Sequence, residues 1–105
     1  MQGVCLRFYT YENEKHKGML LYEWLLELAR KNKIPGGSAF RGIAGYGRHG
    51  ILHEESFYEL ASNVPLEVTF ILEKEKAESF LTILRKENLN LFYTTSHVDY
   101  DFLTA

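Results

Sequence analysis

The sequence predicts an α+β domain in which four strands and two helices follow one another in the order βαββαβ. Two segments carry apolar side chains at helical spacing, four others are rich in β-branched and aromatic residues, and glycine or proline separates several of them. This order matches the ferredoxin-like arrangement, an antiparallel sheet with both helices on one face. We therefore expect one ferredoxin-like domain over residues 1–105, with no internal repeat or linker.

The N-terminal half supplies two strands and a helix. The first strand is expected over residues 4–11, where apolar side chains alternate with others. Apolar residues then recur at helical spacing and predict a helix over residues 19–31, which Pro35 and two following glycines bring to an end. The second strand is expected to begin near Ser38 and to carry a glycine run over residues 40–50.

The C-terminal half repeats the pattern after a connection that the sequence leaves open. Residues 51–63 combine features of an extended segment and of a short helical turn, so we expect only a projecting connection. Pro65 then opens a strand over residues 66–73. An amphipathic helix is expected to follow and to end near Asn88, and residues 89–95 are expected to form the fourth strand.

The sheet face without helices is predicted to be too apolar to meet only water, so we expect self-association to bury it. It would present Tyr9, Tyr11, Ile43, Ile71 and Phe92 among Arg7, Arg41, Glu67 and Thr69.

Composition excludes several classes of function. A formal net charge of -2 provides no basic surface for a nucleic-acid backbone. The apolar runs are far shorter than a bilayer requires and no leader precedes them, so we expect a cytoplasmic protein without membrane insertion. The one cysteine, Cys5, lies in an apolar strand and is expected in the core, which fits a reducing compartment.

The glycine run is the strongest candidate for a binding site. Its backbone amides are able to converge on an anion while Arg48 supplies a charge-assisted hydrogen bond. The spacing fits neither a Walker loop nor a dinucleotide-binding turn, because both of those enter a helix. A bulged strand whose glycines admit a neighbouring subunit explains the same residues, so both interpretations stay open at this point.

Two other chemistries find less support. His49 and His53 share a face at a spacing of four, but a zinc site needs a third or fourth ligand, which His16 or His97 would have to supply. No nucleophile or acid–base pair stands at a specific spacing, since Cys5 is expected in the core and Asp99 and Asp101 in a C-terminal tail. An enzyme is therefore not predicted, and the sequence leaves the identity of any cofactor unknown.

Residues 39–65 carry a resemblance to the PII-like signalling superfamily, and the whole chain resembles, more narrowly, an uncharacterised PII-like domain family of unknown function. The resemblance rests on the stretch Arg41-Gly-Ile-Ala-Gly-Tyr-Gly-Arg-His-Gly50, a polar histidine-containing segment, and the Val64-Pro65 entry into the next strand. It implies a homotrimer whose sheets face one another and whose subunits form a cleft at the base of a flexible loop. Within this resemblance, Gly45 to His49 match a stretch that lines a nucleotide-binding cleft.

Together these observations favour a non-enzymatic PII-like regulator that binds a small anionic effector, such as a nucleotide, and presents residues 50–59 to a protein partner. The residues expected at the ligand are Arg41, Gly45, Tyr46, Gly47, Arg48 and His49. Two alternatives remain open: a divalent-metal-binding trimer that uses His49 and His53, and a purely structural interaction module.

Overall fold

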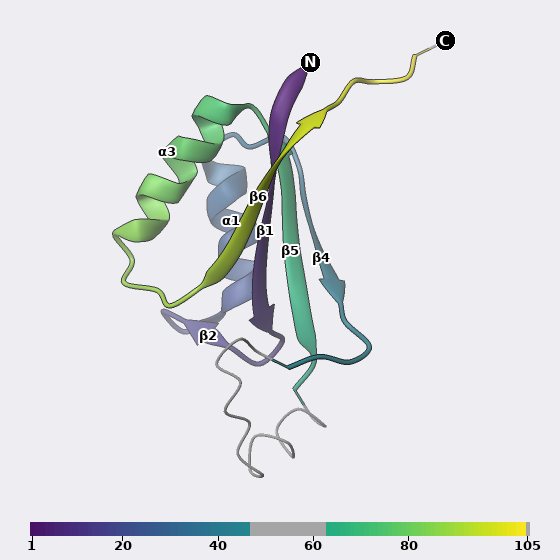
Figure 1. The fold of residues 1–105 in the computed structure, drawn as a ribbon. Helices are drawn as coiled ribbons and strands as arrows, with labels where there is room; N and C mark the ends of the chain where they lie inside the picture. Colours follow the sequence, from purple (N-terminus) through teal and green to yellow (C-terminus); the bar gives the residue numbers. More distant parts are fainter. Residues whose placement is uncertain (47–62, 105) are drawn as a thin grey trace.

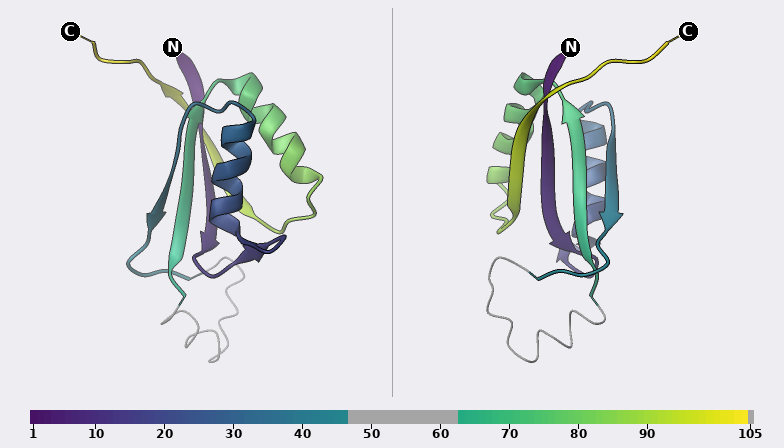
Figure 2. Two further views of the ribbon diagram at one scale, coloured as in Figure 1. Left: turned by 180° about the vertical axis from the view of Figure 1, so that it is seen from behind. Right: turned by 45° about the vertical axis from the view of Figure 1, so that its right-hand side comes forward.

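The computed structural model describes residues 1–46 and 63–104, and it confirms the ferredoxin-like fold. A four-stranded antiparallel sheet in the order β4-β5-β1-β6 carries both helices on one face (Figures 1 and 2). A two-stranded hairpin precedes the first helix. The elements are β1 (Gln2–Tyr11), β2 (Lys15–His16), β3 (Met19–Leu20), α1 (Leu21–Lys31), β4 (Gly37–Arg41), β5 (Pro65–Leu72), α3 (Lys74–Arg85) and β6 (Phe92–Asp99).

The core lies between the sheet and the two helices. Alternate residues of β1 and β5 point into it, so Phe8 stands opposite Val68, and Leu6 opposite Phe70. Three rings meet edge to face at its centre: Phe70 lies 6.0 Å from Phe8 and 5.6 Å from Phe80, between ring centroids. Such aromatic pairs add to the burial of apolar area, and they hold α3 against β1 and β5.

The first helix begins two residues later than predicted, because Met19 and Leu20 pair with Lys15 and His16 as a hairpin. The turn between these strands places Lys17 and Gly18 at φ 51° and 79°. The hairpin contacts the chain just after the C-terminal end of α3, where His16 Nε2 lies 3.0 Å from a carboxylate oxygen of Glu87.

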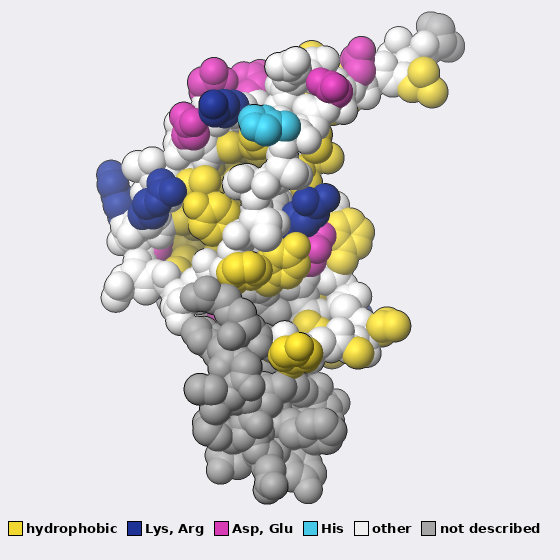
Figure 3. Space-filling model, in the orientation of Figure 1, with side chains coloured by type: hydrophobic (Ala, Val, Ile, Leu, Met, Phe, Trp, Pro, Cys, Tyr) yellow, Lys and Arg dark blue, Asp and Glu magenta, His cyan; other side chains and the backbone are white. Residues whose placement is uncertain are grey.

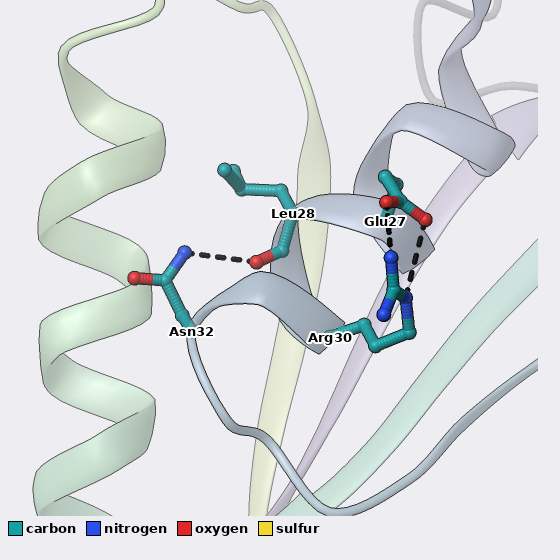
Figure 4. Close-up of polar contacts among 4 residues, drawn as sticks. All are labelled: Glu27, Leu28, Arg30 and Asn32. Atoms are coloured by element: carbon teal, nitrogen blue, oxygen red, sulfur yellow. Dashed lines mark hydrogen bonds and ion pairs between the residues drawn. The ribbon is translucent and has the colours of Figure 1, made fainter.

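The end of α1 is closed by local polar contacts. Asn32 Nδ2 donates to the carbonyl oxygen of Leu28 at 2.8 Å, and Arg30 Nε donates to Glu27 at 3.3 Å (Figure 4). Lys33 follows in the left-handed region at φ 62°, where the chain turns toward β4.

Two strands depart from their predicted bounds. β4 ends at Arg41, so the glycine run follows the strand instead of lying within it. β6 begins at Phe92 and continues to Asp99, later than the predicted residues 89–95. Leu89 and Leu91 are apolar at strand spacing, but they pack against the edge of the core before the strand starts. Asp99 consequently pairs with Gln2 in the sheet and is not part of a tail.

The sheet face opposite the helices, here called the open face, has no covering layer among the described residues. Figure 3 looks onto it and shows hydrophobic side chains gathered over the strands, with a few charged ones between them. Ile71 is 44% exposed and Phe92 45% exposed on this face. Two residues predicted there lie elsewhere: Arg41 stands opposite Leu66 on the helix side of the sheet, and Ile43 lies beyond β4.

Cys5 is buried and unpaired, as predicted. No helix among residues 1–46 and 63–104 is long and apolar enough to cross a membrane.

Candidate functional site

A cleft of about 710 Å³ lies at one end of the sheet, where β1 and β4 end and β5 begins. The segment that follows β4, from Gly42 to Tyr46, forms one side of it. The described residues that line the cleft are Tyr9, Thr10, Tyr11, Glu14, Phe40, Arg41, Gly42, Ala44, Gly45, Tyr46, Pro65, Leu66, Glu67, Asn90 and Phe92.

Close packing on Pro65 holds the glycine segment at the cleft. The Gly42 amide donates to the Pro65 carbonyl oxygen at 2.7 Å, one step beyond the last pair of the ladder. A Cβ at Gly42 would lie 3.1 Å from Pro65 Cγ, tighter than ordinary contact, whereas one at Gly45 would meet the same atom at 3.6 Å. A side chain at Gly42 would therefore require the Pro65 ring or the glycine segment to shift by a few tenths of an ångström.

Aromatic side chains form an apolar wall along the cleft. Tyr9 and Phe92 face one another across β1 and β6 with ring centroids 5.6 Å apart. Phe40, on the edge strand, is 56% exposed, and Tyr46 is exposed on the glycine segment. Rings that are accessible on one side offer a stacking surface to a planar ligand.

Two charged side chains that line the cleft, Arg41 and Glu67, pair with charged groups outside the lining. Arg41 contacts a single oxygen of Glu12, through Nη2 at 2.6 Å and Nε at 2.8 Å. This hydrogen bond, more than the charge of Glu12, raises the pKa of Arg41 above its ordinary value. On the open face, Arg7 lies 3.7 Å from Glu67, which also accepts a hydrogen bond from the Thr69 hydroxyl.

The described part of the cleft thus offers an anion little unpaired positive charge. Arg41 already has a carboxylate partner, and two acidic side chains, Glu14 and Glu67, line the same space. An effector that binds through negative charge would have to draw Arg41 away from Glu12, or use groups beyond the described residues.

The structure brings three of the predicted ligand residues to the cleft: Arg41, Gly45 and Tyr46. The other three, Gly47, Arg48 and His49, lie outside the described residues, as do His53 and the 50–59 connection. Sequence reasoning missed Phe40 and Glu12. Phe40 precedes Arg41 directly in the sequence, and this apolar neighbour of a predicted ligand residue was a signal that it also lines the site. Glu12 comes from a different part of the chain, and only the fold reveals its contact with Arg41.

The metal alternative receives no support from the described histidines. Among residues 1–46 and 63–104, no group of three or more His, Cys, Asp or Glu side chains is close enough to hold a metal ion. His16 is engaged with Glu87 and with the Trp24 ring, whose centroid lies 4.4 Å away.

The strand order and the two helices on one face of the sheet define a ferredoxin-like α+β fold. A solved structure from Thermus thermophilus, provisionally assigned as a PII-like signalling protein, has a TM-score of 0.63 to this chain at 16% identity. That similarity covers 93% of this chain and 88% of the other.

The chain belongs to the DUF190 family, described as uncharacterized ACR, whose model matches residues 3–100. A UPF0166 protein of Aquifex aeolicus (strain VF5) is 35% identical over 86 residues, which is 82% of each chain. A UPF0166 protein of Methanocaldococcus jannaschii is 28% identical over 101 residues, 93% of each chain. The resemblance predicted from the glycine run and its flanks is confirmed.

Proposed function

We propose that this protein is a non-enzymatic PII-like regulator that binds a small anionic effector with a planar ring, such as a nucleotide, in the cleft beside the glycine segment. The observation that carries the proposal is the cleft itself, which joins an aromatic wall, a glycine segment and Arg41 at one end of the sheet. Ligand pockets commonly combine a largely apolar lining with a few polar groups that fix orientation.

Each part of the cleft has a distinct role in this proposal. The ring of the effector packs on Tyr46 and on the aromatic wall, and Gly47, Arg48 and His49 are the proposed partners of its negative group. Arg41 exchanges Glu12 for the effector, because the arginine side chain is 72% exposed and solvent weakens an exposed ion pair of this kind. The exchange couples occupancy to the segment between β1 and β2, where Glu12 lies.

The proposal includes a homotrimer in which the open face is buried and the cleft lies between subunits. Exposed Ile71, Phe92 and Phe40 support burial of this face, since large apolar side chains gathered on one exposed face are typical of an interface. In the proposed mechanism, the 50–59 connection changes order when the effector binds and presents a surface to a protein partner.

The first test is a thermal-unfolding screen of the purified protein against adenine and guanine nucleotides, cyclic nucleotides, small carboxylates and divalent metals. A ligand that binds only the folded state stabilises it by RT ln(1 + [L]/Kd), about 2.7 kcal/mol at a hundredfold excess over Kd. We expect a shift with an anionic ring compound. A shift with a transition metal alone would support the metal-binding alternative, and no shift with any compound would leave the glycine segment as an interface element.

Charge variants then test the cleft. Arg48→Ala is expected to weaken effector binding without changing the oligomeric state. Arg41→Gln should weaken it as well, whereas Glu12→Gln should strengthen it by releasing Arg41 from its competing carboxylate. Arg30→Gln is the matched control, because Arg30 forms a similar exposed pair with Glu27 on α1, outside the cleft lining (Figure 4). Equal affinity in all four variants would place the ligand elsewhere.

A further inference from the structure

One row of side chains crosses the whole sheet at the cleft, on the open face. In this row Glu67 of β5 stands between Tyr9 of β1 and Phe40 of β4. Phe92 of β6 stands opposite Tyr9 and completes the row, and all four side chains line the cleft. Residues directly opposite one another in antiparallel strands have Cβ atoms about 4.5–5.5 Å apart. The row therefore places a single carboxylate between two aromatic rings.

The two oxygens of the Glu67 carboxylate have different surroundings. Oε2 accepts a hydrogen bond from the Thr69 hydroxyl at 2.8 Å and lies 3.7 Å from Arg7 Nε. Oε1 has no hydrogen-bond or ion-pair partner among residues 1–46 and 63–104. The Glu67 side chain is 34% exposed and lines the cleft. Thr69 thus holds the carboxylate by one oxygen and leaves the other as an acceptor for a group in the cleft.

The charge of Glu67 decides which part of an effector faces the row. An anionic group placed there would be repelled by the carboxylate, whereas a planar ring packs on Tyr9 or Phe40 and turns its edge toward Glu67. A charged acceptor that loses water without gaining a donor weakens binding. A ring N–H between two carbonyl groups, as in uracil, would bring those oxygens close to the carboxylate. An amino group on the ring supplies the donor without that repulsion.

We propose that Glu67 selects an effector whose ring carries an amino group, as adenine, guanine and cytosine do. The amino group donates to Glu67 Oε1 while the ring lies on Tyr9 or Phe40, and the anionic group lies toward Arg41. Glu67 is then a residue that determines specificity, and Thr69 positions its carboxylate. The inference rests on the proposed function, because it assigns the ring end of the same effector.

Matched pairs of nucleotides test the assignment, with affinities measured by isothermal titration calorimetry on the purified protein. AMP, GMP and CMP are each compared with the analogue that lacks the amino group: purine riboside monophosphate, IMP and pyrimidinone riboside monophosphate. In a pair that binds, we expect the amino compound to bind about tenfold more tightly, because its partner leaves a charged acceptor without a donor. Equal affinities within every pair that binds, or no binding by any of these nucleotides, would overturn the inference.

Glu67→Gln tests whether this residue causes the preference. Thr69 donates at the Oε2 position and Arg7 lies near it, so the amide oxygen should take that position and turn the amide NH2 group toward the ligand. The preference for the amino compound should then disappear or reverse. Glu14→Gln is the matched control, because Glu14 lines the same cleft with the same charge but lies outside the row. This control should change the affinities of both members of a pair by the same factor.

The outcomes separate this inference from the proposed function. A preference for the amino compound that survives Glu67→Gln would refute the role of Glu67. Nucleotides that bind equally within each pair, and more weakly to Arg41→Gln than to the wild type, would refute that role as well but support the proposed function. If no anionic ring compound binds the wild type, both fail. The comparison of pairs in the wild type decides the inference even if the Glu67→Gln variant does not fold.

Discussion

Gly37→Ala tests whether the first residue of β4 is glycine because of the core behind it. Gly37 stands opposite Phe70 in the ladder, and a Cβ at this position would lie 2.6 Å from Phe70 Cδ1 and 3.1 Å from Leu26 Cδ2. Real side chains do not tolerate the first distance. Phe70 cannot turn aside easily, because it is fully buried between Phe8 and Phe80.

Two opposing effects set the expected magnitude. Overpacking of a filled core costs about 1–3 kcal/mol. The loss of backbone freedom in the unfolded chain returns about 0.4–1 kcal/mol when glycine becomes alanine. We expect a net loss of about 1–2 kcal/mol in the free energy of unfolding, and each kcal/mol lowers the melting temperature by about 4–8 °C in a domain of this size.

The assay is urea denaturation followed by circular dichroism, at one fixed protein concentration because assembly also contributes to stability. Gly36→Ala is the matched control, since a Cβ there meets nothing within 4 Å, and it should be neutral or slightly stabilising. Phe70→Leu shortens the obstructing ring, so the cost of Gly37→Ala should shrink in that background. Equal stability of the Gly36→Ala and Gly37→Ala variants would refute the packing argument.

Three further predictions each concern a single residue. Hydrogen bonds from His16 and Lys17 lower the pKa of Glu87, so the stability that this carboxylate contributes is present above its ordinary value of 4.5 and is lost as the pH falls through the lowered one. The melting temperature of Glu87→Gln should therefore be lower than that of the wild type at neutral pH, and the difference should disappear in acid. The same difference in melting temperature at both pH values would contradict this prediction. Lys33→Gly should raise the free energy of unfolding by up to about 1 kcal/mol, because the backbone of Lys33 is left-handed at φ 62° after α1. Urea denaturation measures this change, and a lower stability of the variant would contradict the prediction. Thr10→Val should stabilise by about 1 kcal/mol, because the buried Thr10 hydroxyl has no partner among the described residues; destabilisation would mean that another group bonds it.

The fold followed from periodicity because most elements bury one face. Alternation in β1 and β5 and helical spacing in α1 and α3 reflect the single core between sheet and helices, so these four elements were placed within a few residues. The fourth strand was misplaced because Leu89 and Leu91 alternate as strand residues do, yet they fill the border of the core ahead of Phe92.

The candidate site was less accessible to sequence reasoning. The glycines indicated a segment of close backbone approach, but not that Pro65 is the group approached at Gly42. Spacing along one strand could not show that Arg41 faces the helix side and pairs with Glu12, because this depends on strand register and on a residue 29 positions away. Contacts between separate segments need the fold.

The edge position of β4 makes this side of the cleft able to open locally. Among the residues that the structure describes, this strand has one sheet neighbour; it has no buried side chain, and it leads directly into the glycine segment. Such a strand opens locally at a free-energy cost well below that of global unfolding. A ligand that bridges Gly42–Tyr46 and β1 would suppress this opening while the three-ring core stays as it is. Within β4, the two states of the protein would then differ in how often the strand detaches, a difference that amide hydrogen exchange records even where the mean positions of the strand coincide.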